Sequence, residues 1–378
     1  MAGKIDIGVE ITWTSTVSAE ILRGVREFAL TQPDWVLRHI DSPIPDDSAL
    51  PVQQRWKPAA GIYAGGVAPF NGKFGSLTGP VVIIGDCSFN WDLRIDLDDA
   101  PVGKMAFQHF QDRGFVHFGF VGNDQPYSLS RYESFVGVLR KKGFSCSVCP
   151  RTPGSMKPRA NKDVAAWLQS LPKPVGILCC HDPIARDLLS VCHAEQLRVP
   201  EEIAILGIDN DLVWCEASTP QLSSIIIPWR RFGWEAANWV ERLLKGEKPK
   251  GDRIVWISPR DVMTRQSTDS IAVTDPDLAR ALAHIRSHAC EGLSVKELVH
   301  ATLLDRRALE RKFAKFLNRS PHDEIRRVRI DRAKLLLSET ALSPNQIAQK
   351  TGFSRKHFAA VFTQIVGVTP LKYRTREL

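Results

Sequence analysis

The sequence lacks the features that mark membrane-embedded and secreted proteins. No apolar run approaches the roughly eighteen residues needed to cross a bilayer, and no signal-peptide core precedes the first strand-like segment. The eight cysteines among 378 residues fit a reducing compartment better than a disulfide-stapled scaffold. We therefore expect a cytoplasmic protein.

Motifs of catalysis and of cofactor binding are also missing. The chain contains no GxSxG nucleophile elbow, no GxxxxGK[ST] phosphate loop and no HExxH zinc motif. Cys146 and Cys149 have CxxC spacing, and Cys179-Cys180 precedes His181, but a structural zinc site needs four ligands, usually as two spaced pairs. Cysteine at the end of an apolar strand commonly acts as a small hydrophobe. We expect a protein that is not an enzyme and binds neither a cofactor nor a metal.

The C-terminal part of the chain contains one pattern twice, at a constant offset of 49 positions. Each copy, at about 294–317 and 343–366, predicts a short helix, a tight turn and a longer amphipathic helix that begins with adjacent cations. In paired helix-turn-helix units the second helix enters the major groove of DNA. A generic helical repeat with a solvated basic face is the alternative, and the coincidence of apolar positions with cations favours DNA binding. The matching positions are Ser294/Ser343, Leu298/Ile347, Arg306-Arg307/Arg355-Lys356, Leu309/Phe358, Phe313/Phe362 and Ser320-Pro321/Thr369-Pro370.

Positive charge is concentrated in the same region. Residues 276–378 carry 20 Lys and Arg against 10 Asp and Glu, whereas the preceding 275 residues carry 30 against 32. A basic module on a near-neutral body is typical of a phosphate-binding domain attached to a sensor or an enzyme. We expect residues 1–267 to form the sensor, 268–275 a linker and 276–378 the DNA-binding domain.

Residues 1–267 alternate between strand-like apolar runs and amphipathic helices. This alternation predicts parallel sheets with helices on both faces, and the length fits two such lobes. The predicted fold class is α/β plus all-α, a two-lobed sensor followed by an all-helical double helix-turn-helix domain. The expected strands are Ile5–Ile11, Trp35–Ile40, Ala60–Ala64, Val81–Ile84, Phe118–Val121, Val175–Cys180 and Ile203–Ile208, and the expected helices are Ser18–Thr31, Val102–Arg113, Arg131–Lys142 and Ile184–Gln196.

Polar residues gather near the carboxyl ends of these predicted strands, where ligands of open α/β sheets bind. Carboxylates, an amide and a guanidinium suit a polyhydroxylated ligand, because a carboxylate accepts from two hydroxyls and arginine supplies a rigid fork of donors. An aromatic face can in addition cover a sugar ring. The predicted ligand-binding residues are Arg131, which follows a predicted Ser128–Arg131 turn, and Asp209, Asn210, Asp182, Asp98 and Trp13. For Asp182, which precedes Pro183, a helix N-cap is the alternative role.

These segments resemble two known families. Ser128-Leu-Ser-Arg131-Tyr-Glu-Ser-Phe135 and Leu206-Gly-Ile-Asp209-Asn210 resemble the LacI/GalR-type sensor domains, which have a periplasmic-binding-protein-like fold. Leu309-Glu-Arg-Lys-Phe313, Gly352-Phe353 and Thr369-Pro-Leu-Lys-Tyr373 resemble the AraC/XylS family. The resemblance implies a small sugar between two sensor lobes and double-stranded DNA as the partner of the C-terminal domain.

The resemblance also implies which residues face the DNA groove. They are Arg306, Arg307, Glu310 and Arg311 in the first unit, and Arg355, Lys356 and His357 in the second, where Phe358 follows Phe353 one position earlier than is usual in the family. We expect Asp305 and Ser354 to cap these two helices. A connecting helix over His322–Ser338 is expected to leave Arg326, Arg327 and Arg329 for phosphate or solvent.

The function that follows from the resemblance is transcription regulation by a homodimer. Its binding to operator or promoter DNA is expected to be controlled by a small sugar, with D-xylose or a related pentose first, and RNA polymerase is an expected partner if the protein activates. Two alternatives remain open at this point. One is a sugar-processing α/β enzyme with a basic helical tail, and the other is a DNA-binding regulator with a non-functional sensor.

Overall fold

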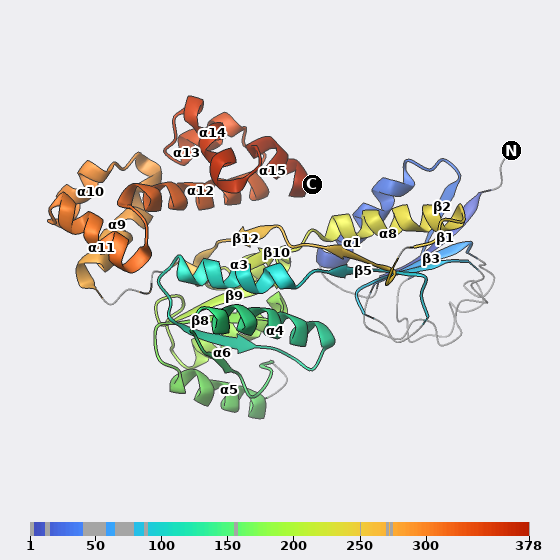
Figure 1. Cartoon of the computed structure of the whole chain (residues 1–378), viewed down its shortest axis with the longest axis horizontal. Helices are drawn as coiled ribbons and strands as arrows, with labels where there is room; N and C mark the ends of the chain where they lie inside the picture. The colour runs from blue at the N-terminus through green and yellow to red at the C-terminus, as the bar shows by residue number, and fades with distance from the viewer. Residues whose placement is uncertain are drawn as a thin grey trace. The chain divides into compact units, whose positions relative to one another are not determined.

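The computed structural model describes residues 4–11, 16–40, 58–64, 79–86, 90–154, 158–249, 251–269, 272 and 275–377. The chain divides into two compact units and passes back and forth between them (Figure 1). The first unit comprises Met1–Pro101, Asp211–Val213 and Ile227–Arg260, and the second comprises Val102–Asn210, Trp214–Ile226 and Asp261–Leu378.

The first unit contains a six-stranded parallel sheet in the order β11-β5-β4-β3-β1-β2. Its helices α1 and α8 pack closely against each other, because Gly24 and Gly233 lie at their contact. A Cβ at Gly24 would come within 1.9 Å of the Arg230 carbonyl oxygen, and one at Gly233 within 1.9 Å of the Ile21 carbonyl oxygen. The elements are β1 Ile5–Ile11, α1 Thr16–Ala29, β2 Trp35–Ile40, β3 Ala60–Ala64, β4 Val81–Ile84, β5 Leu93–Leu97, α8 Trp229–Leu244 and β11 Ile254–Ile257.

The second unit begins with a second six-stranded sheet, in the order β12-β10-β9-β8-β6-β7. All neighbours are parallel except β12, which pairs antiparallel with β10. Strands β8 and β9 are almost wholly buried, so they read as continuous apolar runs. The elements are α3 Ala100–Gln111, β6 His117–Val121, α4 Pro126–Lys141, β7 Cys146–Val148, α5 Pro158–Ser170, β8 Val175–Cys179, α6 Asp182–Ala194, β9 Ile203–Asp209, α7 Leu212–Ala217, β10 Ser223–Ile226, β12 Asp261–Met263 and the short η2 Gln266–Thr268.

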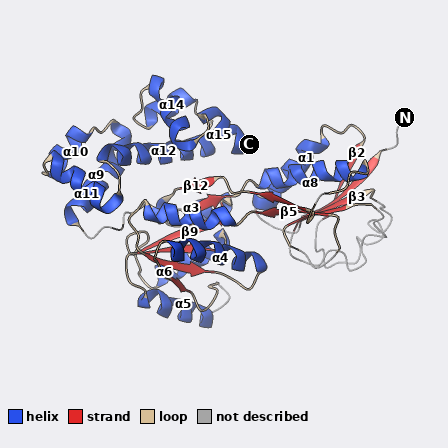
Figure 2. Ribbon diagram, viewed as in Figure 1, coloured by secondary structure: helices blue, strands red, loops and turns tan. Residues whose placement is uncertain are grey.

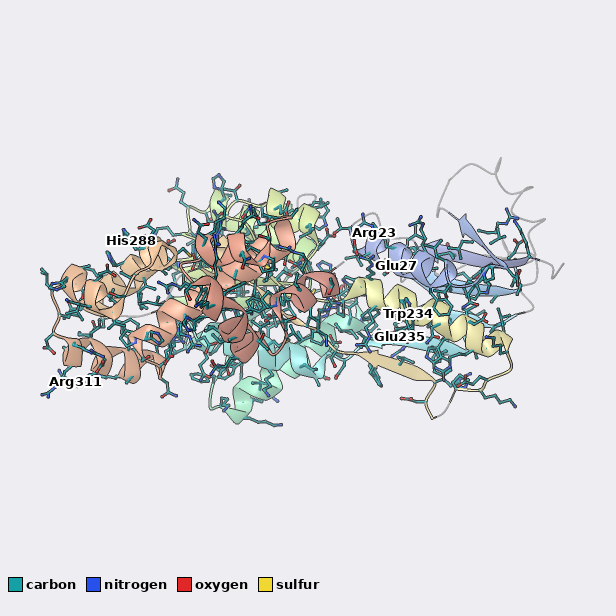
Figure 3. All side chains as sticks on the ribbon, turned by 90° about the horizontal axis from the view of Figure 1, so that it is seen from above. Arg23, Glu27, Trp234, Glu235, His288 and Arg311 are labelled. Atoms are coloured by element: carbon teal, nitrogen blue, oxygen red, sulfur yellow. The ribbon has the colours of Figure 1, made fainter. Side chains whose placement is uncertain are left out.

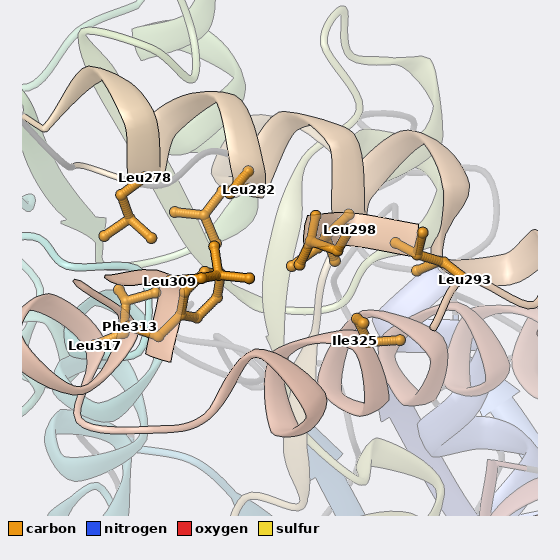
Figure 4. Close-up of a cluster of buried hydrophobic side chains, with 11 residues drawn as sticks. Leu278, Leu282, Leu293, Leu298, Leu309, Phe313, Leu317 and Ile325 are labelled. Atoms are coloured by element: carbon orange, nitrogen blue, oxygen red, sulfur yellow. The ribbon is translucent and has the colours of Figure 1, made fainter. Parts of the chain in front are cut away.

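Seven α-helices follow in the described part of the C-terminal region, which contains no strand (Figure 2). They enclose two separate apolar cores, the first of which includes Leu298, Leu309 and Phe313 (Figure 4). The second includes Ile347, Phe358 and Phe362. The helices are α9 Pro276–His288, α10 Val295–Thr302, α11 Arg306–Leu317, α12 Pro321–Glu339, α13 Pro344–Lys350, α14 Arg355–Val366 and α15 Pro370–Glu377.

Helix α12 belongs to both cores. Ile325 packs in the first core, whereas Ile330, Ala333 and Leu337 pack in the second. With 19 residues and a rise of 1.5 Å per residue, α12 is about 28 Å long. One rigid helix therefore carries both helix-turn-helix units.

The predicted fold class is confirmed, and the four N-terminal strands have the predicted bounds. Two local predictions are wrong. Helix α4 begins at Pro126, so the Ser128–Arg131 segment is helical and not a turn, because proline is well suited to the first helical turn. The N-cap of α6 is His181 rather than Asp182, and its Nδ1 accepts from the Ile184 N–H at 3.2 Å. None of the described helices is long and apolar enough to cross a membrane.

Candidate effector site and nucleic-acid interface

Arg131 and Asp209 meet in the second unit, at the carboxyl ends of β8 and β9. Arg131, on α4, donates from Nη1 to the carbonyl of Cys180, the residue that follows β8. Its Nη2 lies 3.7 Å from Oδ1 of Asp209, the last residue of β9. The two side chains are only 6% and 14% exposed. A buried cation and carboxylate at the end of a parallel sheet form the kind of polar pair that orients a small polar ligand.

Three further side chains lie near this pair and were not among the predicted ligand-binding residues, although His181 is one of the polar residues that follow the predicted strands. Tyr127 lies one helical turn before Arg131, whose guanidinium carbon is 5.0 Å from the tyrosine ring centroid. The Tyr127 hydroxyl accepts from Asn123 Nδ2 at 2.8 Å, and the His181 ring centroid lies 6.0 Å from that of Tyr127. Asn123 and His181 closely follow β6 and β8, so the strand-end rule that selected Asp209 also applies to them.

The backbone at the end of β9 has an unusual conformation. Asp209 has φ of 116° and Asn210 has φ of 53°, in the region that side-chain-bearing residues rarely adopt. Two buried groups hold Asn210 in place. The Ser224 hydroxyl accepts from its N–H at 2.9 Å, and Arg265 Nη1 donates to its Oδ1 at 2.9 Å. Strain of this kind persists where the surroundings over-determine it, and it clusters at binding sites.

Asp182 holds neighbouring elements of this region through buried hydrogen bonds. It is fully buried, accepting from the Ser224 hydroxyl at 2.6 Å and from the Cys215 thiol at 3.5 Å. A Cβ at Gly207 would lie 2.1 Å from its Oδ1. Since Asp182 has no exposed surface, we assign it to positioning β9 and β10 rather than to direct ligand contact.

Burial favours the neutral form of two further ionisable groups near this site, His181 and Cys180. Burial lowers the pKa of His181 to about 4, so its Nδ1 can act as an acceptor at neutral pH. Burial likewise raises the pKa of the Cys180 thiol to about 11. In the described ranges no group of His, Cys, Asp and Glu side chains is arranged to hold a metal ion.

The remaining predicted ligand residues belong to the first unit. Asp98 follows β5 and is half-buried. Its Oδ1 accepts from the Ala100 N–H at 3.2 Å, and its Oδ2 lies 3.4 Å from the Ser258 hydroxyl, which donates to it. The Ala100 contact places its carboxylate at the N-terminal end of α3. Trp13 lies outside the described residues.

On α11 the predicted groove-facing residues share one exposed face. Arg306, Arg307, Glu310 and Arg311 are all exposed, and Arg311 projects outward from the helix (Figure 3). Arg306 Nε donates to Glu310 at 2.9 Å, an exposed i,i+4 pair. Lys312, by contrast, pairs with Asp275 at 2.5 Å and Asp277 at 3.2 Å and so attaches α11 to α9.

On α14 the predicted residues occupy the first turn. Arg355, Lys356 and His357 are all exposed there. The N-terminal residues of a recognition helix are those that contact base edges. Ser354 stands at the N-cap position, but its hydroxyl contacts His357 Nδ1 at 2.7 Å in place of the backbone. Asp305 caps α11 as predicted, accepting from the Ala308 N–H at 2.8 Å.

The prediction for the α12 arginines is wrong at two of three positions. Arg327 is paired with Glu324 and Asp331, both at 2.7 Å. Arg329 donates to the carbonyls of Ala289 at 2.7 Å and Leu293 at 2.9 Å. Only Arg326 lacks such an anchoring role, and it donates to Gln364 on α14 at 3.2 Å. Arg327 and Arg329 therefore hold the domain together and are not available to DNA phosphates.

Comparisons with known proteins agree with this architecture. Residues 107–268 match the periplasmic binding protein-like domain, and residues 298–376 match the helix-turn-helix domain. The xylose operon regulatory protein of Escherichia coli strain K12 is 32% identical over 74% of this chain and 73% of its own length. Its counterpart in Haemophilus influenzae strain Rd is 31% identical over 74% of both chains. The chain belongs to the family of xylose operon regulatory proteins.

A solved structure extends the likeness to the whole chain of this regulator. The structure of a xylose-binding transcription activator covers 99% of this chain and 98% of its own, with a TM-score of 0.63 and 26% identity. The regulator is a DNA-binding transcription factor with a periplasmic-binding-like sensor, and the alternative of a sugar-processing enzyme is set aside.

Proposed function

We propose that the sensor of this regulator binds D-xylose or a closely related pentose, and that the sugar controls binding to operator or promoter DNA. One observation carries the proposal: the Escherichia coli and Haemophilus influenzae relatives, each matched over 74% of the chain, are both named for the xylose operon. A regulator with a non-functional sensor is the remaining alternative.

The chemistry of the second-unit site supports a polyhydroxylated ligand. Asp209 offers carboxylate oxygens to hydroxyl donors, Arg131 offers donors to hydroxyl oxygens, and the Tyr127 ring offers an aromatic face. In such a site, a ligand that lacks one hydroxyl leaves a buried polar group unpaired, at a cost of about 1–3 kcal/mol. This cost gives a means of discriminating between sugars. Asn210 belongs to the same site, where hydrogen bonds from its N–H and to its Oδ1 hold the backbone after β9. We keep Asp98 and Trp13 as candidate ligand-binding residues.

The exposed faces of α11 and α14 are the proposed DNA contacts. Cations there can read guanine O6 and N7 or bind phosphate. With α12 about 28 Å long, the two recognition helices suit successive major grooves on one face of the DNA, roughly 34 Å apart. We further propose a homodimer working in the cytoplasm, and RNA polymerase as a partner where the protein activates. The domain boundaries 1–267, 268–275 and 276–378 are part of this proposal.

A sugar screen on the full-length protein tests the proposal. Thermal unfolding is measured with D-xylose, L-arabinose, D-ribose and D-glucose, and each hit is titrated by calorimetry. A pentose at a hundred times its dissociation constant should stabilise the protein by about 2.7 kcal/mol. Preference for glucose would refute the pentose assignment. No response to any sugar, with operator binding intact, would establish the non-functional sensor.

A further inference from the structure

A buried arginine joins the second sheet to the helix that carries both DNA-reading units. Arg113 follows α3 and is 3% exposed. Its Nε donates to the Thr268 carbonyl at 2.9 Å, its Nη1 to the His109 carbonyl at 3.0 Å and its Nη2 to the Thr264 hydroxyl at 3.1 Å. The same Nη2 lies 3.4 Å from the Asp331 carboxylate on α12. Arg113 therefore contacts the sensor and the DNA-binding region at once.

On α12, Asp331 is part of a buried ion network. Arg327 bridges Asp331 and Glu324, with Nη contacts of 2.7 Å to each. Glu324 has no exposed surface and also accepts from Arg319 Nε at 2.6 Å. Arg319 in turn donates to the Asp112 carbonyl, beside Arg113. Burial alone would raise the pKa of Glu324, but Arg327 and Arg319 outweigh it and hold the pKa at about 2. The network is thus charged and docks α12 on the end of α3.

On the sensor side, a line of buried hydrogen bonds begins at His109. Arg113 Nη1 lies 3.2 Å from His109 Nδ1, and because a guanidinium only donates, Nδ1 accepts and the ring proton resides on Nε2. His109 Nε2 then donates to the Thr268 hydroxyl at 2.8 Å, and that hydroxyl donates to Ser223 Oγ at 2.7 Å. All these side chains are buried. Bonds that point in one direction polarise one another, so the line responds as a unit.

The line ends beside the proposed sugar site. The Ser223 hydroxyl donates to the Arg265 carbonyl at 2.9 Å and accepts from the Arg265 N–H at 2.8 Å. The Arg265 side chain donates to Asn210 Oδ1, next to Asp209 in the strained turn after β9. A continuous path of hydrogen bonds therefore runs from the end of β9 to α12, and each of its steps joins buried or half-buried groups.

We infer that Arg113 is the positioning residue that couples the state of the effector site to α12. The inference rests on the proposed function, since it needs a ligand that acts at Asp209. A ligand that shifts the turn at Asp209 and Asn210 moves Asn210 Oδ1, which accepts a hydrogen bond from Arg265. The hydrogen bonds described above then connect Arg265 to Arg113, and Arg113 to Asp331 on α12. Because α12 packs in both helix-turn-helix cores, a change in how Arg113 holds Asp331 moves both recognition helices together.

The chain offers a matched control for simple attachment. Lys334, one turn further along α12, pairs with Asp261 on β12 at 2.7 Å. This pair also joins the sensor to α12 with one cation and one carboxylate, at side-chain exposures of 13% and 25%. Lys334 acts on His109 through its charge, which helps to lower the pKa of His109, and not as a member of the hydrogen-bonded line through His109 and Thr268. If these contacts serve only to attach α12 to the sensor, the loss of Lys334 and the loss of Arg113 should change the sugar dependence of operator binding equally.

The experiment measures operator affinity of the full-length protein with and without saturating D-xylose, together with D-xylose affinity. The variants are Arg113→Met, Asp331→Asn, Thr268→Val and Lys334→Met. Allosteric coupling typically changes affinity about 5–150-fold. We expect Arg113→Met, Asp331→Asn and Thr268→Val to bind D-xylose within about twofold of wild type while the operator-affinity ratio collapses toward one. Lys334→Met should retain the ratio.

Thr268→Val and Asp331→Asn keep side-chain size and decide the matter if Arg113→Met does not fold. A double variant Arg113→Met/Asp331→Asn should lose no more coupling than either single variant, since the two residues act through one contact. A wild-type ratio in Arg113→Met, or in both size-preserving variants, would overturn the inference, as would an equal loss in Lys334→Met. A wild type that binds operator but ignores every pentose would overturn the proposed function and this inference with it.

Discussion

Ser294 and Ser343, 49 positions apart, cap the first helices of the two DNA-reading units in the same way. The Ser294 hydroxyl accepts from the Glu297 N–H, and the Glu297 side chain accepts from the Ser294 N–H at 2.7 Å. Ser343 and Gln346 repeat this arrangement, with the return bond at 2.8 Å. Each box satisfies two backbone N–H groups that a helix start leaves unpaired. The internal repeat is therefore a repeat of local structure as well as of sequence.

The first prediction concerns Asp209. Asp209→Asn keeps the shape but replaces an acceptor oxygen by a donor, so the sugar hydroxyl it receives is left without its partner. Sugar affinity should fall at least tenfold, which corresponds to the lower part of the 1–3 kcal/mol range for an unpaired buried polar group. Operator binding should remain but no longer respond to sugar. Calorimetric titration measures the loss.

Asp163→Asn is the control for this charge change. Asp163 lies on α5 in the same unit and its side chain is 55% exposed. This variant should bind sugar like wild type. If Asp209→Asn unfolds while its surviving fraction binds sugar normally, Asp209 is structural and the assignment is refuted.

The second prediction concerns the exposed cations of α11. Arg306→Ala and Arg307→Ala should weaken operator binding by about 1–3 kcal/mol for each true base contact and relax specificity at one base pair. Sugar affinity should not change. The matched control is Arg280→Ala on α9, whose side chain is 67% exposed and which lies outside the recognition helices. Equal weakening of operator and random-sequence DNA would identify Arg306 and Arg307 as phosphate contacts.

The third prediction is that residues 276–378 bind DNA by themselves. Both apolar cores of this region are built from its own residues, so the fragment retains the packing that positions α11 and α14. Its affinity should fall steeply with salt, because each neutralised phosphate contributes about −0.9 to the slope of log K against log salt. Fluorescence anisotropy across a salt series provides the slope. A flat dependence would be inconsistent with phosphate binding.

The fourth prediction is a loss of stability on acidification. Burial lowers the pKa of His181 from 6.5 to about 4 and that of His109 well below 6.5. Between pH 6.5 and 4 the unfolded chain therefore binds more protons than the folded one, and stability falls as pH falls. His181 alone should account for about 3 kcal/mol by pH 4. Below about pH 4.5 the Glu324 carboxylate binds a proton in the unfolded chain, whereas in the folded protein its pKa is about 2. This difference adds a further loss of stability as the pH falls.

His181→Asn isolates the histidine contribution to this pH dependence. Asparagine is a good N-cap acceptor and has no ionisable group, so it preserves the bond to the Ile184 N–H. Urea unfolding of the variant at pH 7, 5.5 and 4 should show a shallower decline than wild type. An identical decline would mean that His181 is not buried neutral.

Much of the fold follows from local sequence. Apolar runs such as Ile5–Ile11 and Val81–Ile84 match the structure at both ends because buried parallel strands leave an unbroken hydrophobic signal. The N-cap role of Asp305 could also be predicted from the sequence. The start of α4 could not be predicted, because Pro126 and Ser128 fit both a turn and a helix start, whereas its end was predicted to within one residue.

The candidate site could be predicted only in part. Asp209 stands out because it is a polar residue at the end of an apolar strand. Arg131 stands out because its segment resembles a motif of LacI/GalR-type sensor domains. Arg113 and Asp331 are 218 positions apart, and nothing local indicates that they meet. The error on Arg327 was avoidable, since Glu324 and Asp331 flank it at helical spacings of three and four residues, which favour ion pairs.

The shared helix α12 restricts how the spacing of the DNA target can change during evolution. Each residue inserted into an α-helix advances its end by 1.5 Å and turns it by about 100°, since 3.6 residues make one turn. A single insertion near the middle of α12 would swing the second recognition helix away from the DNA face read by the first. Changes of a whole turn, about 5.4 Å, keep the two faces aligned. The separation of the two half-sites read by one protomer is therefore expected to be nearly constant among proteins that keep this helix, while the bases within each half-site diverge freely.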